Sequence, residues 1–287
     1  MKASQWSAVL AGGWLVAAAG AAEAGPWVPD TGEIYAKLDE RVFLASRYTT
    51  GDGETLDIAG YQELTTALYG EVGLGDGWAA LVAWDLARVM ALSDGDGVHV
   101  RPGDARLGLR WSPLDLGPGG RWAVEAWAGL PFASSESLGA VVDETGRRIA
   151  ELRAGPGVFE AAADLSVGWS FEAFFFEAAI GYLQRFGGQD GALRWQAAAG
   201  GRAWAWLEGA VRLAGFHRVD TGDAPLLENP SGLTNGSTHT SAILELGARL
   251  SEAWTVGATG QFSIAGLDVR RHGRGAVFSV FVAFSTL

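Results

Sequence analysis

Polar and apolar residues alternate along most of the chain after residue 60. Successive side chains of a β-strand point to opposite faces, so this alternation predicts strands with one polar face and one apolar face. The alternating segments are joined in turn by tight turns and by long polar loops. This arrangement is typical of outer-membrane barrels, which have short turns at one end and long loops at the other. The pattern predicts an all-β fold, a transmembrane up-and-down antiparallel β-barrel.

We count twelve strands, and an even number is the rule for single-chain bacterial barrels. The expected strands are residues 32–43, 61–72, 78–90, 103–111, 121–130, 157–169, 171–183, 193–202, 204–216, 239–250, 254–265 and 274–287. Asp76-Gly77 follows the second strand and is a strong hairpin signal. The longest loop covers residues 131–156, and the sequence leaves open whether it enters the lumen as a plug. The last strand has apolar residues on both faces, so its register is also open.

The alternation assigns the two faces of each strand. In the strand at 239–250, Leu244 and Leu246 lie on one face and Glu245 and Arg249 on the other. A lysine or arginine facing lipid at mid-membrane costs about 2–4 kcal/mol, so the charged face must be the lumen. We therefore expect ten charged residues to line the lumen and to set its selectivity: Asp85, Arg106, Arg110, Glu125, Glu177, Arg194, Glu208, Arg212, Glu245 and Arg249.

These charges are nearly balanced and lie close to one another on neighbouring strands. The expected neighbours are Asp85 with Arg106 and Arg110, Glu177 with Arg194, Glu208 with Arg202, and Arg212 with Glu245 and Arg249. Two interpretations stay open: a constriction that selects solutes by charge and size, or a salt-bridged filling that stabilises the barrel. Barrels of eight strands are filled by side chains and those of 16–18 enclose wide channels, so twelve strands permit a narrow pore.

Five tryptophans fall next to the short turns, where the membrane–water boundary is expected. They are Trp78, Trp111, Trp169, Trp204 and Trp254. Tryptophan is enriched at this boundary, so we expect an aromatic girdle, although ordinary packing at strand ends is the alternative.

The first residues resemble an export signal. Lys2 precedes an apolar run at residues 8–19, and Ala22-Glu23-Ala24 has the small-x-small form of a cleavage site. We expect residues 1–24 to be a signal peptide and residues 25–287 to be the barrel. No later segment has the roughly 20 uncharged apolar residues that a spanning helix needs.

Composition excludes several classes of function. The net charge is −12, and it stays −12 without residues 1–24 because that segment contains one base and one acid. Nucleic-acid binding requires clustered basic residues, so we expect none. The chain has no cysteine, which excludes thiolate metal sites and cysteine nucleophiles. We expect no cofactor and no metal.

One pair of residues suggests hydrolytic chemistry. His239 and Ser241 share a strand face, and an imidazole beside a serine can act as its base. Their face also carries Glu245 and should point into the lumen, whereas a lipid hydrolase needs the pair to face lipid. Glu228 or Asn235 would have to supply the third residue. We expect a protein that is not an enzyme and keep the hydrolase as a remote alternative.

Four segments resemble the outer-membrane proteins named for the meta-cleavage pathway of phenol degradation. They are GEIYAKL (residues 32–38), FLASRYTTGDG (43–53), YQELTTALYGEVGLGDGW (61–78) and GDARLGLRW (103–111). This resemblance implies a barrel that passes small solutes, aromatic or hydrophobic ones among them, and it implies no catalytic residues. The family's barrels usually end in an aromatic residue, whereas this chain ends in Phe284-Ser285-Thr286-Leu287.

We therefore expect a narrow passive channel for small solutes in the outer membrane of a Gram-negative bacterium. Its partners would be the outer-membrane lipids, the solute and the barrel-assembly machinery. The alternative from another class is a sealed structural or adhesive barrel that acts through its outer loops.

Overall fold

A computed structural model of the chain describes residues 25–93, 97–219, 237–264, 269 and 272–286. The expected signal peptide, residues 1–24, lies outside the described residues. No helix in the described part of the chain is long and apolar enough to cross a membrane. The strands are β1 (Ile34–Thr49), β2 (Thr55–Gly75), β3 (Trp78–Leu92), β4 (Val98–Arg101), β5 (Ala105–Trp111), β6 (Gly120–Leu130), β7 (Gly139–Val142), β8 (Arg148–Leu152), β9 (Glu160–Ser170), β10 (Phe174–Arg185), β11 (Gly191–Trp204), β12 (Leu207–Val219), β13 (His239–Arg249), β14 (Trp254–Ser263) and β15 (His272–Ser285).

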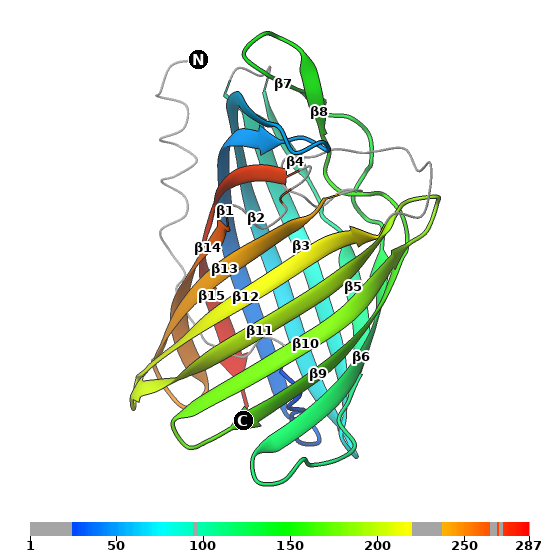
Figure 1. Ribbon diagram of the computed structural model, residues 1–287. Coiled ribbons are helices and arrows are strands. Elements are labelled where there is room, and N and C mark those ends of the chain that lie inside the picture. The colour runs from blue at the N-terminus through cyan, green and yellow to red at the C-terminus, as the bar shows by residue number, and fades with distance from the viewer. Residues whose placement is uncertain (1–24, 94–96, 220–236, 265–268, 270–271, 287) are drawn as a thin grey trace.

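These strands form a closed antiparallel barrel (Figure 1). Thirteen of them make one sheet, and the pairing of β2 with β3 closes it. Both β4 and β5 pair with β3, so they share one position, and twelve strand positions surround the lumen. The expected twelve-stranded up-and-down barrel is confirmed. Full closure leaves no unpaired sheet edge, as a barrel in lipid requires.

Most strand boundaries differ from the prediction by a few residues, and β1 and β2 extend about six residues further toward the loop between them. Two differences have a clear physical cause. Pro102 and Gly103 divide the expected strand at 103–111 from an extra strand, β4, because proline has no backbone N–H to donate to the sheet. Trp204 ends β11 rather than beginning the next strand, because it pairs with Leu207 across a two-residue turn.

The Asp76-Gly77 turn forms as the sequence predicts. Trp78 pairs with Gly75, so Asp76 and Gly77 make a two-residue hairpin loop. Their φ angles are +51° and +75°. A type I′ turn requires positive φ at both central residues, which glycine and aspartate tolerate.

Apolar side chains cover the outside of the barrel and charged ones lie inside it. On β13, Leu244 and Leu246 are 51% and 61% exposed, whereas Glu245 is 8% exposed. On β10, Phe174 and Ile180 are likewise exposed and Glu177 is buried. A soluble domain shows the opposite arrangement. The predicted assignment of faces on these strands is therefore confirmed.

The structure also settles the register of the last strand. Phe281 points inward and is buried, while Phe278 and Val280 are exposed on the outside. The ring of Phe281 lies 4.1 Å from Lys37 Nζ, a cation–π contact on the inner wall. Gly257 faces this ring, and a Cβ there would overlap it.

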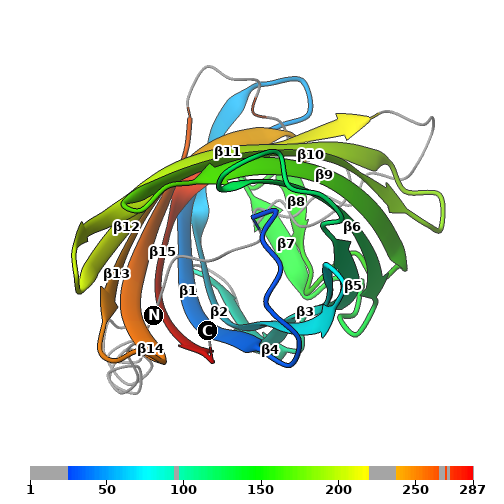
Figure 2. The same ribbon diagram turned by 90° about the horizontal axis from the view of Figure 1, so that it is seen from below.

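Two segments narrow the barrel at its ends. At the long-loop end, β7 and β8 form a hairpin within the loop at 131–156, and Val141 and Leu152 pack against Tyr48 and Met90 of the barrel wall. At the short-turn end, residues 25–33, which we call the N-terminal strap, lie within the ring of strands (Figure 2). The strap occupies part of the interior and the hairpin packs on the wall at the long-loop end, so the path through the barrel is narrower than the backbone ring.

Candidate functional site

A row of cross-strand pairs runs along the inner wall over seven strands, from β5 to β13. Each residue of the row is the register partner of the next: Arg110, Glu125, Asp164, Gly181, Arg194, Phe216 and His239. Side chains that are partners across antiparallel strands point to the same face. The row therefore places acidic, basic and aromatic groups next to one another along the inner wall, from the strap to the loop-side half of the lumen.

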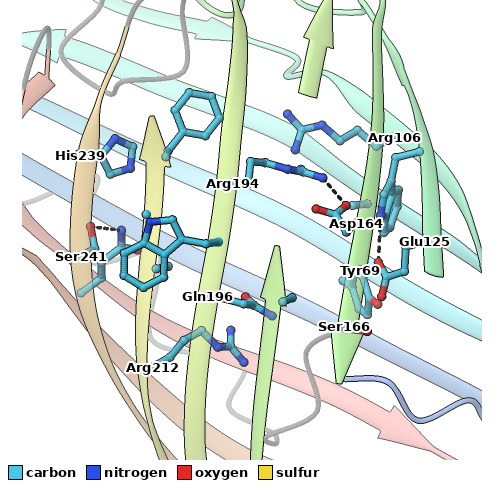
Figure 3. A pocket seen from close by; sticks show the side chains of 18 residues that line it. Tyr69, Arg106, Glu125, Asp164, Ser166, Arg194, Gln196, Arg212, His239 and Ser241 are labelled. Carbon is cyan, nitrogen blue, oxygen red and sulfur yellow. Dashed lines mark hydrogen bonds and ion pairs between the residues drawn. The ribbon is translucent and has the colours of Figure 1, made fainter. Parts of the chain in front are cut away.

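Glycine at position 181 allows an ion pair to cross a whole strand. Gly181 lies between Asp164 on β9 and Arg194 on β11, and these two residues bond to each other over it. A Cβ at position 181 would overlap the Asp164 carboxylate. The absence of a side chain on β10 thus leaves space for the ion pair (Figure 3).

Arg106 reaches its carboxylate in the same way. Gly129 on β6 lies between Arg106 and Glu160, and Arg106 Nη2 donates to Glu160 Oε2 at 2.9 Å. Arg185, the register partner of Glu160 on β10, donates to the other oxygen, also at 2.9 Å. Glu160 is thus shared by two guanidinium groups, and replacing either one leaves it paired.

Arg110 holds the strap to the wall. It donates to Glu125 Oε1 and Glu71 Oε2, both at 2.7 Å, and to the backbone oxygen of Trp27 at 3.0 Å. The Trp27 ring packs edge-on against Phe175 at 6.1 Å. The strap therefore spans from β5 to β10 inside the barrel, and its anchor is a buried guanidinium bonded to two carboxylates.

A second buried arginine holds the loop at the other end. Arg88 donates to Glu63 Oε1 at 2.7 Å from Nη2 and at 2.8 Å from Nε, and to the backbone oxygen of Ala154. Asp104 Oδ1 accepts a hydrogen bond of 2.8 Å from Ala133 N at the other side of the same loop. The loop at 131–156 is thus bonded at both of its ends.

The turn of the hairpin is held by one carboxylate. Asp143 accepts hydrogen bonds from the hydroxyl of Thr145 and from the guanidinium of Arg147. The Thr145 bond, together with those from Arg147, lowers the pKa of Asp143 to about 2. Asp143 therefore keeps its charge, and with it these hydrogen bonds, to a lower pH than an ordinary aspartate would.

The ten residues predicted to line the lumen have these positions. Arg106, Glu125, Arg194 and Arg212 line one interior cavity, and Asp85 lines two others with Arg106. Arg110 is buried in the wall below the strap, and Glu208 and Arg249 lie near the short turns, 3.9 Å apart. Glu177 and Glu245 are buried beside Arg212 and Lys37, at 3.9 and 3.7 Å.

Many ion-pair partners lie two strands apart, whereas the sequence pattern suggested adjacent strands. Asp85 bonds to Arg41 on β1 at 2.5 Å diagonally across β2, where Ala67 lies opposite Asp85 and Thr65 lies opposite Arg41. Glu177 and Arg212 likewise have Ala198 between them. Small residues on the middle strand make these longer pairs possible, and sequence reasoning did not identify Lys37, Arg41, Arg88 or Glu160 as partners. These four residues occupy lumen-facing positions in the alternating pattern, and that position could have identified them from the sequence.

Two of the interior cavities share lining residues in the middle of the lumen. The turn-side cavity, about 450 Å³, is lined by Tyr69, Glu125, Gln196 and Arg212 among others. The loop-side cavity, about 310 Å³, is lined by Arg41, Phe43, Arg185 and His272 among others. Five residues line both cavities, and we call them the neck: Arg106, Arg194, Phe216, His239 and Gln261. Figure 3 shows Arg106, Arg194 and Asp164 gathered on one side of the turn-side cavity and His239 on the other.

The five tryptophans of the expected girdle lie at the short-turn end of the barrel. Trp78, Trp111, Trp204 and Trp254 are exposed on the outside, and Trp169 is half-buried. Trp78 stacks on Trp111 with centroids 5.6 Å apart, and Trp204 stacks on Trp206. Their place at the membrane boundary stays a prediction.

His239 and Ser241 are not arranged as a lipid hydrolase would need. Both line the turn-side cavity, inside the barrel. Ser241 Oγ accepts a hydrogen bond from Gln261 Nε2 at 3.2 Å, and the His239 ring stacks on His272 at 4.3 Å. The proposed third residues, Glu228 and Asn235, lie outside the described residues.

Comparison with solved structures supports the class that the fold defines, an outer-membrane β-barrel. No family model and no curated protein matches the sequence. The structure is similar to the COG4313 outer membrane channel from Pseudomonas putida F1, with a TM-score of 0.67 and 10% identity over 93% of this chain and 100% of that one. The likeness to the NanC porin is weaker, with a TM-score of 0.48 and 12% identity over 86% of this chain and 98% of that one. The KdgM porin gives a TM-score of 0.45 and 7% identity over 88% of this chain and 99% of that one. At 10% identity the likeness to the COG4313 channel shows the fold alone, and it agrees with the twelve strand positions of this barrel.

Proposed function

We propose that this protein is a passive channel for small solutes in the outer membrane of a Gram-negative bacterium. The observation that carries this proposal is a pair of cavities, lined by charged as well as apolar side chains and sharing the five neck residues, inside a closed barrel with an apolar exterior. An apolar exterior suits lipid, and a lumen of charged side chains suits a water-filled path. The strap and the hairpin restrict both ends, which favours a narrow pore over a wide one.

The proposal includes several expectations that come from the sequence. Residues 1–24 act as a cleaved signal peptide, the short-turn end is periplasmic, and the five tryptophans mark the membrane boundary there. The ten charged residues predicted from the sequence contribute to selectivity, with Arg106 and Arg194 of the neck foremost. The segments at 32–111 support membership of the family named for phenol degradation, and thus a solute range that includes aromatic compounds.

Conductance in planar lipid bilayers tests the channel directly. Full-length protein purified in detergent should insert and give small, stepwise, ohmic currents in KCl. Insertion is checked separately, by protection of the barrel from protease in vesicles. Barrels that insert and fold yet stay silent would refute the channel.

The restriction of both ends favours one second candidate, a sealed barrel that acts through its outer loops. The Arg110–Trp27 bond and the packing of Leu152 against the wall are contacts that a permanently closed barrel would also use. Under this alternative, deleting the hairpin abolishes the function while the currents stay at zero in every variant.

A further inference from the structure

The neck between the two cavities has two chemically different sides. Arg106 and Arg194 provide guanidinium groups, and Phe216 and His239 provide ring faces. Arg194 and Phe216 are register partners, and so are Phe216 and His239, so the two sides adjoin on one wall. A solute that moves between the cavities must pass these groups.

The charge that this neck offers to a solute is positive, although the whole chain is acidic. The Arg106 side chain is 40% exposed, whereas its partner Glu160 is 5% exposed; for Arg194 and Asp164 the values are 23% and 17%. Glu160 thus lies behind Arg106 and holds it toward the lumen, whereas Asp164 lies beside Arg194 and neutralises part of its charge. At Arg106 a solute in the neck meets N–H donors before it meets carboxylate oxygens, which favours anions.

The aromatic side of the neck continues as a ladder of stacked rings toward the long-loop end. Phe216 stacks on His239 at 5.9 Å, His239 on His272 at 4.3 Å, and His272 on Phe43 at 6.1 Å, with interplanar angles of 19°, 10° and 25°. Four ring residues on β12, β13, β15 and β1 thus form one ladder along the inner wall. Two residues of this ladder, Phe216 and His239, also line the turn-side cavity. Planar rings gain stabilisation by stacking on such faces.

We propose that the neck selects organic anions that carry a planar ring, of which aromatic carboxylates are the simplest class. This inference rests on the proposed channel function and names its solute. The carboxylate of the solute accepts hydrogen bonds from Arg106 and Arg194, and its ring lies against Phe216 and His239. The side-chain amide of Gln261 offers a polar contact at the same level.

Equilibrium binding tests the neck without requiring conduction. Full-length protein in detergent is titrated calorimetrically with benzoate, cyclohexanecarboxylate and benzylammonium. Benzoate should bind more tightly than cyclohexanecarboxylate, and benzylammonium should not bind. Arg106→Gln should weaken benzoate about tenfold, the scale of one lost hydrogen bond to a charged group, and Arg106→Lys should restore part of the loss. Phe216→Leu should remove the preference for the aromatic acid.

The chain offers a matched control for the arginine variants. Arg121 is 43% exposed, close to the 40% of Arg106, but it pairs with Asp115 beside a short turn and lies outside the neck. Arg121→Gln should leave benzoate binding unchanged. Glu160 keeps Arg185 as a partner in Arg106→Gln, so that variant should fold.

Reversal potentials in a KCl gradient complete the test. The wild-type channel should prefer chloride over potassium, and Arg106→Gln should reduce that preference while Arg121→Gln keeps it. Benzylammonium binding as tight as benzoate, or benzoate binding that survives both neck substitutions, overturns the inference even if the channel conducts. Silent barrels that still bind benzoate through the neck refute the channel and support the site.

Discussion

Replacing Arg110 by methionine should cost this barrel a large part of its stability. Arg110 is 1% exposed and its partners Glu71 and Glu125 are 6% and 7% exposed, so all three groups are shielded from water. Methionine fills much of the same volume but donates no hydrogen bond. The substitution leaves two buried carboxylates and the Trp27 carbonyl without the guanidinium that bonds them.

The expected magnitude follows from this burial. Removing one member of a buried ion pair typically costs about 3–5 kcal/mol, because the remaining charge stays desolvated. The exposed pair of Arg121 and Asp115, with side chains 43% and 61% exposed, should contribute only about 0–1 kcal/mol. Arg110→Met and Arg121→Met should therefore differ by several kcal/mol although each removes one guanidinium group.

Reversible unfolding in urea, followed by tryptophan fluorescence in lipid vesicles, measures both variants. A third protein combines Arg110→Met with Glu71→Gln and Glu125→Gln, which removes the stranded charges and should regain much of the loss. Equal stability of the two single variants would refute the reasoning. So would a combined variant no more stable than Arg110→Met, because buried charge would then not be the cause.

Three further predictions concern the lumen and its two restrictions. Gly181→Ala should destabilise the barrel by about 1–3 kcal/mol in the same unfolding assay, because the new Cβ displaces Asp164 from its ion pair. The control is Gly139→Ala, which should be neutral because a Cβ there meets nothing within 4 Å. Equal effects of the two substitutions would contradict the proposed role of the missing side chain at position 181. Trp27→Ala should loosen the strap and raise the single-channel conductance, and a conductance equal to wild type would show that the strap does not limit the current. Leu152→Asp places a charge in the packed contact between the hairpin and the wall, and should open the long-loop end to cleavage by added protease; resistance equal to wild type would contradict that packing.

The alternation in the sequence was sufficient to predict the barrel, because its physical cause acts within each strand. Each strand has one face toward lipid and the other toward the lumen, so apolar and polar residues alternate within each strand. In β13, for example, Leu244 lies outside and Glu245 inside. The Asp76-Gly77 turn is equally local, because the positive φ angles depend on those two residues. The last strand was the exception, since Phe281 is apolar and faces inward, where it contacts Lys37 and lies over Gly257.

The partners of the lumen charges could not be read from the sequence. A guanidinium extends far enough to cross an intervening strand, and whether it does so depends on the residue beneath it. Gly129 and Gly181 look like ordinary strand glycines in the sequence, yet each one lets an arginine bond to a carboxylate two strands away. Register and strand tilt decide which glycine lies under which arginine, and both are properties of the closed barrel.

By itself, the sequence determined the fold class, the number of strands and which residues face the lumen, because hydrophobic burial in lipid acts on each strand separately. The tertiary structure alone decided that the strap and the hairpin restrict the two ends, that Glu160 lies behind Arg106, and that Phe43, Phe216, His239 and His272 form one ladder of rings. The ladder joins Phe43 to His272, more than 200 positions apart in the chain, and the pairing of β1 with β15 in the closed barrel brings these two residues together.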